Sequence, residues 1–368
     1  MRPVFVFMFA ALAAAAQSPA PQPPRPAGGG WRRVENPKPA QPPVEAAPKG
    51  TEAVKPAAPG ADSNETPTFK AGTTLVRIDV QVVNNKQPVA GLKSSDFVLK
   101  EEGVERHIEY FGQESEPLQV LLLLDVSGSM GKLLREMATV AQEALSSLKP
   151  EDQIAVALFS RRAEFTQELT GEKRLAVVAL QDAPMDHNLG AGTAINDCIM
   201  QVTEYLRQQP PFAGRRALII LTDNGGVHYQ LPDEKVVRAL SENDTVLNAI
   251  VPPGIKPPPA MPKGADVNPD FTPANVFRIA EDTGGEVLRA DKAGARFQEM
   301  LERIRNRYSL GITATAAPEG AFRRLQVELS ADARRRYPKA EVHARSGYYA
   351  QGRTDSAQAQ PQPPAGQR

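Results

Sequence analysis

The chain has 368 residues, enough for two compact domains with tails, and its 43 basic and 43 acidic side chains leave no net charge. This balance argues against binding to nucleic acid or to an anionic membrane surface. The single cysteine, Cys198, excludes an internal disulfide, and its apolar neighbours indicate a buried, unreactive thiol.

The N-terminus has the features of a secretory signal peptide. A basic residue, Arg2, precedes a short apolar stretch, and small residues follow at positions 14–16. We therefore expect residues 1–16 to be a signal peptide, with an uncleaved anchor as the alternative. The apolar stretch is shorter than the ~20 residues that a membrane-spanning helix needs. The sequence thus predicts an exported protein, periplasmic or extracellular, with no membrane span after signal cleavage.

Two segments have compositions typical of disorder. Proline makes up about one quarter of residues 17–67, and the tail 351–368 is rich in Gln and Pro. Neither can bury enough apolar surface to fold, so we expect a disordered linker and a disordered tail.

Alternating sequence on both sides of the centre predicts a small β domain. Period-two alternation predicts strands at 73–84, 97–101 and 104–111 before the centre, and at 308–312, 324–329 and 340–345 after it. Neither group has enough strands to be stable alone. We therefore predict that 68–116 and 307–350 together form one β-sandwich, split in sequence by the central domain, 117–306.

In the centre, apolar strands alternate with amphipathic helices, which indicates an α/β fold with a doubly wound, mostly parallel six-stranded sheet. The strands are expected at 118–125, 153–159, 164–169 (an antiparallel edge), 216–223, 245–251 and 286–289, and the helices at 131–148, 172–180, 194–207, 232–242, 273–282 and 293–306. In the common order 3-2-1-4-5-6, the first and fourth strands meet at the topological switch point. Asp125 and Asp223 end these two strands, so both carboxylates are predicted to face one crevice.

Short oxygen-bearing side chains, Asp125, Ser127 and Ser129, stand at alternate positions where the first strand ends. Such hard donors suit Mg²⁺, Ca²⁺ or Mn²⁺. This Asp-x-Ser-x-Ser pattern resembles the metal-ion-dependent adhesion site of von Willebrand factor type A domains. That family also requires a Thr before a later helix and an Asp after a further buried strand, and Thr193 and Asp223 stand at these places.

The resemblance implies a metal site and a binding mechanism. Ser127, Ser129 and at times Thr193 would bind the cation directly, while Asp125 and Asp223 often act through water. An exposed Asp or Glu of a protein partner would then complete the coordination. Further residues expected to support the site or its loops are Gly128, Gly192, Thr222, Asn224 and Asp197.

The segment 88–97 and the ending 345–350 also resemble secreted bacterial proteins in which a type A domain lies between flanking β segments. With these flanks, the similarity extends over about 73–350. It implies the fold more strongly than a function.

Several alternatives remain open at this stage. Asp125 and Ser129 could cap the helix expected near Met130, and Thr193 could cap the next helix. A structural envelope module with an unoccupied site is a second alternative, and a metal-dependent hydrolase is a third. We expect no enzyme, because Ser127 stands where related phosphatases carry a second, proton-transferring Asp. The Pro-rich loop 251–272 either shapes partner choice or is a loose insertion.

Overall fold

The computed structural model describes residues 75–113, 116–185, 189–190, 192–226, 231–259, 274–290 and 292–350. The expected signal peptide (1–16), linker (17–67) and tail (351–368) lie outside these residues. All described residues belong to the unit Glu65–Arg368. None of the helices in the described ranges is long and apolar enough to span a bilayer.

A six-stranded sheet forms the centre of the described chain, in the order β11-β10-β9-β6-β7-β8. Neighbouring strands are parallel except β8, which runs antiparallel to β7. The strands are β6 (Leu118–Asp125), β7 (Gln153–Phe159), β8 (Ala163–Thr170), β9 (Arg215–Leu221), β10 (Thr245–Val251) and β11 (Val287–Arg289). Read from the β8 edge, this is the predicted order 3-2-1-4-5-6, so the predicted fold class is confirmed.

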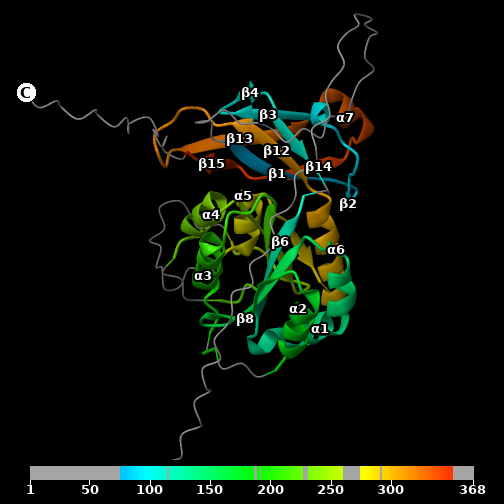
Figure 1. The fold of residues 1–368 in the computed structure, drawn as a ribbon, viewed down its shortest axis with the longest axis vertical. Coiled ribbons are helices and arrows are strands. Elements are labelled where there is room, and N and C mark those ends of the chain that lie inside the picture. Colours follow the sequence, from blue (N-terminus) through cyan, green and yellow to red (C-terminus); the bar gives the residue numbers. More distant parts are fainter. Residues whose placement is uncertain are drawn as a thin grey trace, which may run out of the picture. The chain divides into compact units, whose positions relative to one another are not determined.

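Helices cover both faces of this sheet (Figure 1). One face carries α1 (Gly131–Ser146), α2 (Lys173–Asp182) and α6 (Ala293–Arg305), and the other carries α3 (Ile195–Gln208), α4 (Asp233–Glu242) and α5 (Val276–Thr283). Side chains of β6 alternate between the two layers: Leu122 packs with the first set of helices and Leu123 with the second. Because both faces of β6 are buried, its sequence is apolar without a break from Val120 to Leu124.

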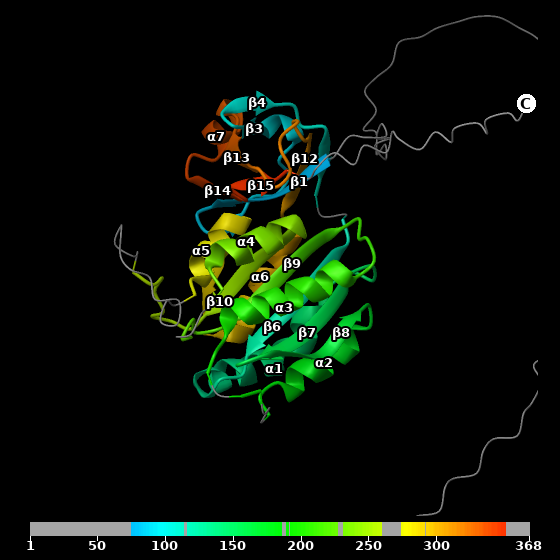
Figure 2. The ribbon, with the colours of Figure 1, turned by 90° about the vertical axis from the view of Figure 1, so that its left-hand side faces the viewer.

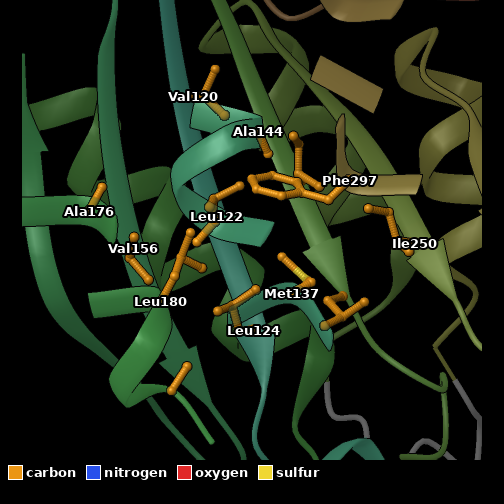
Figure 3. Close-up of a cluster of buried hydrophobic side chains, with 14 of the residues drawn as sticks. Val120, Leu122, Leu124, Met137, Ala144, Val156, Ala176, Leu180, Ile250 and Phe297 are labelled. Atoms are coloured by element: carbon orange, nitrogen blue, oxygen red, sulfur yellow. The ribbon is translucent and has the colours of Figure 1, made fainter. Parts of the chain in front are cut away.

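The core between the sheet and the first set of helices contains large side chains from several elements. Figure 3 shows Phe297 of α6 and Met137 of α1 beside Leu122 and Leu124 of β6. All four side chains are almost completely buried. This packing fixes the position of β6, and therefore the position of the polar residues that follow it.

Two smaller sheets form a sandwich from segments on both sides of the central domain (Figure 2). The first has the order β14-β1-β12-β5, with β2 paired to β1, and the second has the order β15-β13-β3-β4. Their inner faces share one core, which includes Ile78, Leu99 and Leu310. The elements are β1 (Leu75–Asn84), β2 (Gln87–Pro88), η1 (Ser94–Asp96), β3 (Phe97–Glu101), β4 (Val104–Arg106), β5 (Tyr110–Gly112), β12 (Tyr308–Thr313), β13 (Phe322–Leu329), α7 (Ala331–Arg336), β14 (Ala340–Ala344) and β15 (Gly347–Tyr349).

One predicted strand of this sandwich is wrong. The segment 104–111 is not a single strand, because β4 ends at Arg106 and the chain then crosses to the other sheet, where β5 pairs with β12. Arg106 makes an ion pair with Glu101 and donates to the carbonyl of Thr313 (2.9 Å), so it holds the end of β4. Period-two alternation continues through such a crossing and cannot reveal it.

Candidate metal centre

The buried end of the candidate site is the carboxylate of Asp125, the last residue of β6. Its side chain is fully buried, and its two oxygens accept hydrogen bonds from Ser127 N (2.9 Å) and Thr222 Oγ1 (2.8 Å). Burial raises the pKa of Asp125, the hydrogen bonds from Ser127 and Thr222 oppose this rise, and the nearby charge of Asp223 adds to it. Both oxygens of Asp125 are therefore already engaged by the protein.

The exposed end of the site lies in the turn between β6 and α1. The Ser127 and Ser129 hydroxyl oxygens are 3.2 Å apart, and Ser129 Oγ donates to Asp223 Oδ2 at 2.6 Å. Ser129 is exposed, whereas Ser127 and Asp223 are half-buried. The structure thus brings Asp125, Ser127, Ser129 and Asp223 together, at the carboxyl ends of the adjacent strands β6 and β9.

Helix capping does not explain these side chains. The residue before α1 is Met130, because a 3₁₀ turn, η2 (Gly128–Met130), separates Ser127 from the helix. The residue before α3 is Ala194 rather than Thr193. Neither helix has a side-chain cap, so the oxygens of the site are not used for this purpose.

Thr193 belongs to a loop that is fastened to the end of β7. Ser160, just after β7, shares its hydroxyl proton between the carbonyl oxygens of Gly190 (2.9 Å) and Gly192 (2.6 Å). The Ser160 carbonyl accepts from Ala194 N at 2.8 Å. Thr193 is therefore held next to the end of β7, the neighbour of β6, and its side chain is half-buried.

The turn after β9 carries Asp223. The strand ends at Leu221, two residues earlier than predicted, so Thr222 and Asp223 lie in the turn. Thr222 Oγ1 accepts from Asn224 N (3.1 Å), and Asp223 Oδ1 accepts from Gly225 N (2.9 Å). These hydrogen bonds orient Asp223 Oδ2 toward Ser129.

Asn224 joins this turn to the start of α5. Its backbone is left-handed (φ 57°), a conformation that Asn adopts more readily than most residues. Its side chain donates to Ala274 O (2.8 Å) and accepts from Val276 N (3.2 Å). Ala274 follows the predicted Pro-rich loop, of which residues 260–273 lie outside the described ranges.

Residues 120–226 match the family model of the von Willebrand factor type A domain. The chain contains a von Willebrand factor type A domain. Type A domains generally act as protein-interaction modules. The matched range includes every residue of the candidate site, from Asp125 to Asp223.

Several solved structures are similar to the type A domain and its flanks at low sequence identity. No curated protein matches the sequence significantly. A von Willebrand factor type A structure from Catenulispora acidiphila is 13% identical, with a TM-score of 0.39, covering 78% of this chain and 76% of that one. An aerotolerance-related membrane protein from Bacteroides fragilis, carrying multiple mutations to serine, is 17% identical, with a TM-score of 0.39 and coverage of 51% and 98%. A hypothetical protein, BatB, from Bacteroides thetaiotaomicron is 18% identical, with a TM-score of 0.37 and coverage of 51% and 97%.

Two residues of α3 in the type A domain lie near the site without joining it. Asp197 is half-buried in the first turn of α3, and within the described ranges no hydrogen bond or ion pair links it to Asp125 or Asp223. Cys198 is fully buried, and burial, with the charges of Asp197 and Asp125, raises its pKa to about 12. The prediction of a buried, unreactive thiol is consistent with this environment.

The donor set of the type A domain fits a hard divalent cation. Among the described residues, neither Asp125 nor Asp223 makes an ion pair with Lys, Arg or His. No group of three or more His, Cys, Asp or Glu that could hold a metal occurs in the described part of the chain. Any metal at this site would therefore need the serine and threonine hydroxyls, which are acceptable ligands for Mg²⁺ but poor ones for soft metals.

Sequence reasoning missed two contributions to the site. It did not identify Ser160, because a serine directly after a strand is common and carries no spacing signal. It named Asn224 as a supporting residue but not its role, since its two side-chain hydrogen bonds reach residues fifty positions further along the chain. Such long-range partners become visible only in the folded molecule.

Proposed function

We propose that the type A domain binds a protein partner through a divalent cation, Mg²⁺ or alternatively Ca²⁺ or Mn²⁺, held between Ser127, Ser129 and Asp223. The observation that carries this proposal is the pair of carboxylates, Asp125 and Asp223, which lie at the carboxyl ends of adjacent strands with no basic side chain paired to either among the described residues. Two negative charges gathered in this way are costly unless a cation balances them.

The roles of the residues follow from their present hydrogen bonds. Ser127 and Ser129 offer hydroxyl oxygens at the surface, while Asp125 is engaged by Thr222 and by backbone N–H, so we assign it an indirect, charge-balancing role. Thr193 would add a further hydroxyl from its loop. Because few charged groups would touch the cation directly, it would keep affinity for an incoming carboxylate.

The partner chemistry that suits such a site is an exposed Asp or Glu on another protein. A divalent cation supplies a Lewis-acidic centre, and a carboxylate oxygen is a hard donor that can replace a water on it. We infer that this happens outside the cytoplasm, in the periplasm or beyond the cell. This location rests on the signal-like residues 1–16, and fractionation of cells that produce the full chain tests it.

A capture experiment tests the binding function. Purified full chain would be incubated with solubilised envelope proteins in Mg²⁺ or in EDTA, and captured proteins compared. We expect capture only with Mg²⁺, its loss in Ser129→Ala, and its retention in Ser146→Ala. Ser146 is a matched control, because it is an exposed serine at the far end of α1 whose hydroxyl donates to Glu143 O (2.6 Å) and, within the described residues, to no group of the metal centre. Equal capture by all variants in EDTA would contradict the proposal and favour a structural module.

A further inference from the structure

A cavity lies where the sandwich meets the type A domain. It has a volume of about 1040 Å³ and is lined by residues of β2, β14, α5, β11 and α6. This volume is at the upper end of the range of about 300–1,000 Å³ that is typical of ligand sites. Glu286, in its wall, precedes β11 and so lies at the amino edge of the central sheet. The candidate metal centre is at the carboxyl edge, and the two sites are separate.

The buried wall of the cavity contains a carboxylate that is only half satisfied. The Glu286 side chain is 9% exposed, and its Oε2 pairs with Arg303 Nη1 at 2.7 Å. Its Oε1 is buried and has no hydrogen-bond partner within the described structure. A buried carboxylate oxygen without a donor is costly, so an N–H from outside the protein would stabilise it.

The backbone holds Glu286 in place independently of its side chain. Glu286 N donates to Asn248 Oδ1 (3.2 Å), and Glu286 O accepts from Ala249 N (2.9 Å), which ties this residue to β10. These two hydrogen bonds fix the backbone of Glu286, a residue that lines the cavity.

Among the described residues, none of the hydrogen bonds of the neighbouring cation, Arg303, goes to Glu286 Oε1. Arg303 donates through Nη1 to Glu286, through Nε to Glu299 (2.9 Å), and through Nη2 to Lys86 O (2.6 Å). His343 also lines the cavity, and burial lowers its pKa. Arg307 and Arg303 lower the His343 pKa as well, while Glu286 and Glu341 raise it. The imidazole is therefore uncharged near neutral pH and does not neutralise Glu286.

The mouth of the cavity adds further carboxylates. Glu281 and Glu302 line it, and neither has a cationic partner among the described residues. Among the described residues, Glu341 has its nearest basic neighbour in the uncharged imidazole of His343, whose Nε2 lies 3.9 Å from Glu341 Oε2. Lys86 and Arg289 also line the mouth, so its outer charges are mixed, whereas the unsatisfied group at the buried end is an acceptor.

We propose that this cavity binds a cationic nitrogen group, an ammonium or a guanidinium, whose N–H donates to Glu286 Oε1. The charge-assisted hydrogen bond satisfies the buried oxygen, and the Glu281 and Glu302 carboxylates attract the cation to the mouth. The same chemistry is present in a free amine and in the Lys or Arg side chain of a peptide.

Calorimetry on the full chain tests this site with paired probes. Cadaverine carries two ammonium groups, and pentane-1,5-diol has the same length without charge. We expect binding of cadaverine and none of the diol. Nα-acetyl-lysine amide and lysine-containing peptides distinguish the sources: tighter binding of the peptides assigns the site to a protein ligand, and tighter binding of cadaverine assigns it to a free amine. Absence of binding by all the cationic probes at millimolar concentration would overturn the proposal.

Variants connect the binding to Glu286. Glu286→Gln should weaken cadaverine binding at least about tenfold, because it removes the charge of the acceptor. The double variant Glu281→Gln/Glu302→Gln changes only exposed side chains and should weaken it by a smaller factor, which keeps the test open if Glu286→Gln does not fold. Asp125→Ala should bind cadaverine like the wild type, since it affects only the metal centre. Unchanged affinity in both the Glu286 and the double variant would contradict the proposal.

Discussion

At the scale of single residues, Thr222 holds the buried half of the candidate metal centre. Its hydroxyl donates to Asp125 Oδ2 (2.8 Å) and accepts from Asn224 N (3.1 Å), so one group links the turns after β6 and β9. The side chain is fully buried, and water cannot replace it there. The sequence named Thr222 as a candidate only through its place before Asp223, and the double hydrogen bond gives the physical reason for a hydroxyl at this position.

Removing this hydroxyl should destabilise the protein and weaken the site. Thr222→Val has nearly the same shape but leaves Asp125 Oδ2 and Asn224 N without partners, so we expect a loss of about 1–3 kcal/mol in the free energy of unfolding. Urea denaturation measures this loss, and Thr222→Ser, which keeps the hydroxyl, should recover most of it. A Thr222→Val protein as stable as the wild type would show that the hydroxyl is not needed.

The buried thiol of Cys198 should make stability depend on pH in the alkaline range. Burial raises its pKa to about 12, whereas an unfolded thiol titrates near about 8.5. The unfolded state therefore loses its proton first, and the stabilising contribution of the neutral thiol is present below about pH 8.5 and is lost as the pH rises.

Comparison with Cys198→Ala isolates this contribution, because all other titrating groups are common to both proteins. The wild type should lose about 2 kcal/mol more than the variant between about pH 8 and about pH 10. Urea denaturation at each pH gives the difference. If both proteins lose stability in parallel, the thiol ionises over the same pH range in the folded and the unfolded state, and burial does not raise its pKa.

At the scale of elements, the sequence predicted the central sheet well and the sandwich less well. An apolar run such as 120–124 is expected to be a central strand buried on both faces. The rule that crossover connections are right-handed then limits the possible orders of the strands. The segment 104–111 failed because alternation identifies a strand face but not the sheet to which it belongs. The metal-centre residues were located by their place at strand ends, whereas the ties made by Ser160 and Asn224 depend on tertiary contacts.

The loop before α3 offers a test of how the elements position Thr193. Ser160→Ala removes the hydroxyl that holds the carbonyl groups of Gly190 and Gly192, so the loop should loosen and metal affinity should fall several-fold, with about 1 kcal/mol lost in stability. Calorimetric titration with Mn²⁺ measures the affinity. Ser147→Ala is the matched control, because Ser147 Oγ also bonds to a backbone carbonyl, Ala144 O (2.7 Å), but at the far end of α1. Equal Mn²⁺ affinities in Ser160→Ala and Ser147→Ala would show that the loop does not contribute to metal binding.

At the scale of the whole molecule, buried charges join the sandwich to the type A domain. Arg215 donates to Ile304 O and Arg307 O, both at 3.0 Å, and so satisfies the end of α6. Its Nε lies 3.4 Å from Glu116 Oε2. Burial raises the pKa of Asp79, on β1 of the sandwich, and Arg215 is the largest influence that opposes this rise.

Replacing Arg215 should lower the stability of the sandwich and of the type A domain together. Arg215→Leu leaves the carbonyls of α6 without a donor and removes a cation from buried Glu116 and Asp79, so we expect a loss of about 3–5 kcal/mol in the free energy of unfolding. Arg207→Leu is the control, because its pair with Glu204 is exposed, and it should leave stability nearly unchanged. A comparably small effect of Arg215→Leu in urea denaturation would mean that the junction does not depend on this charge.

The central claim concerns the cation between the ends of β6 and β9, and a crystal grown with Mn²⁺ tests it most directly. Anomalous diffraction should locate one Mn²⁺ about 2.0–2.6 Å from the hydroxyl oxygens of Ser127 and Ser129. The hydrogen bond from Ser129 to Asp223 should then be replaced by contacts to the ion or its waters. The absence of an anomalous signal at this place, with that hydrogen bond intact, would contradict the account.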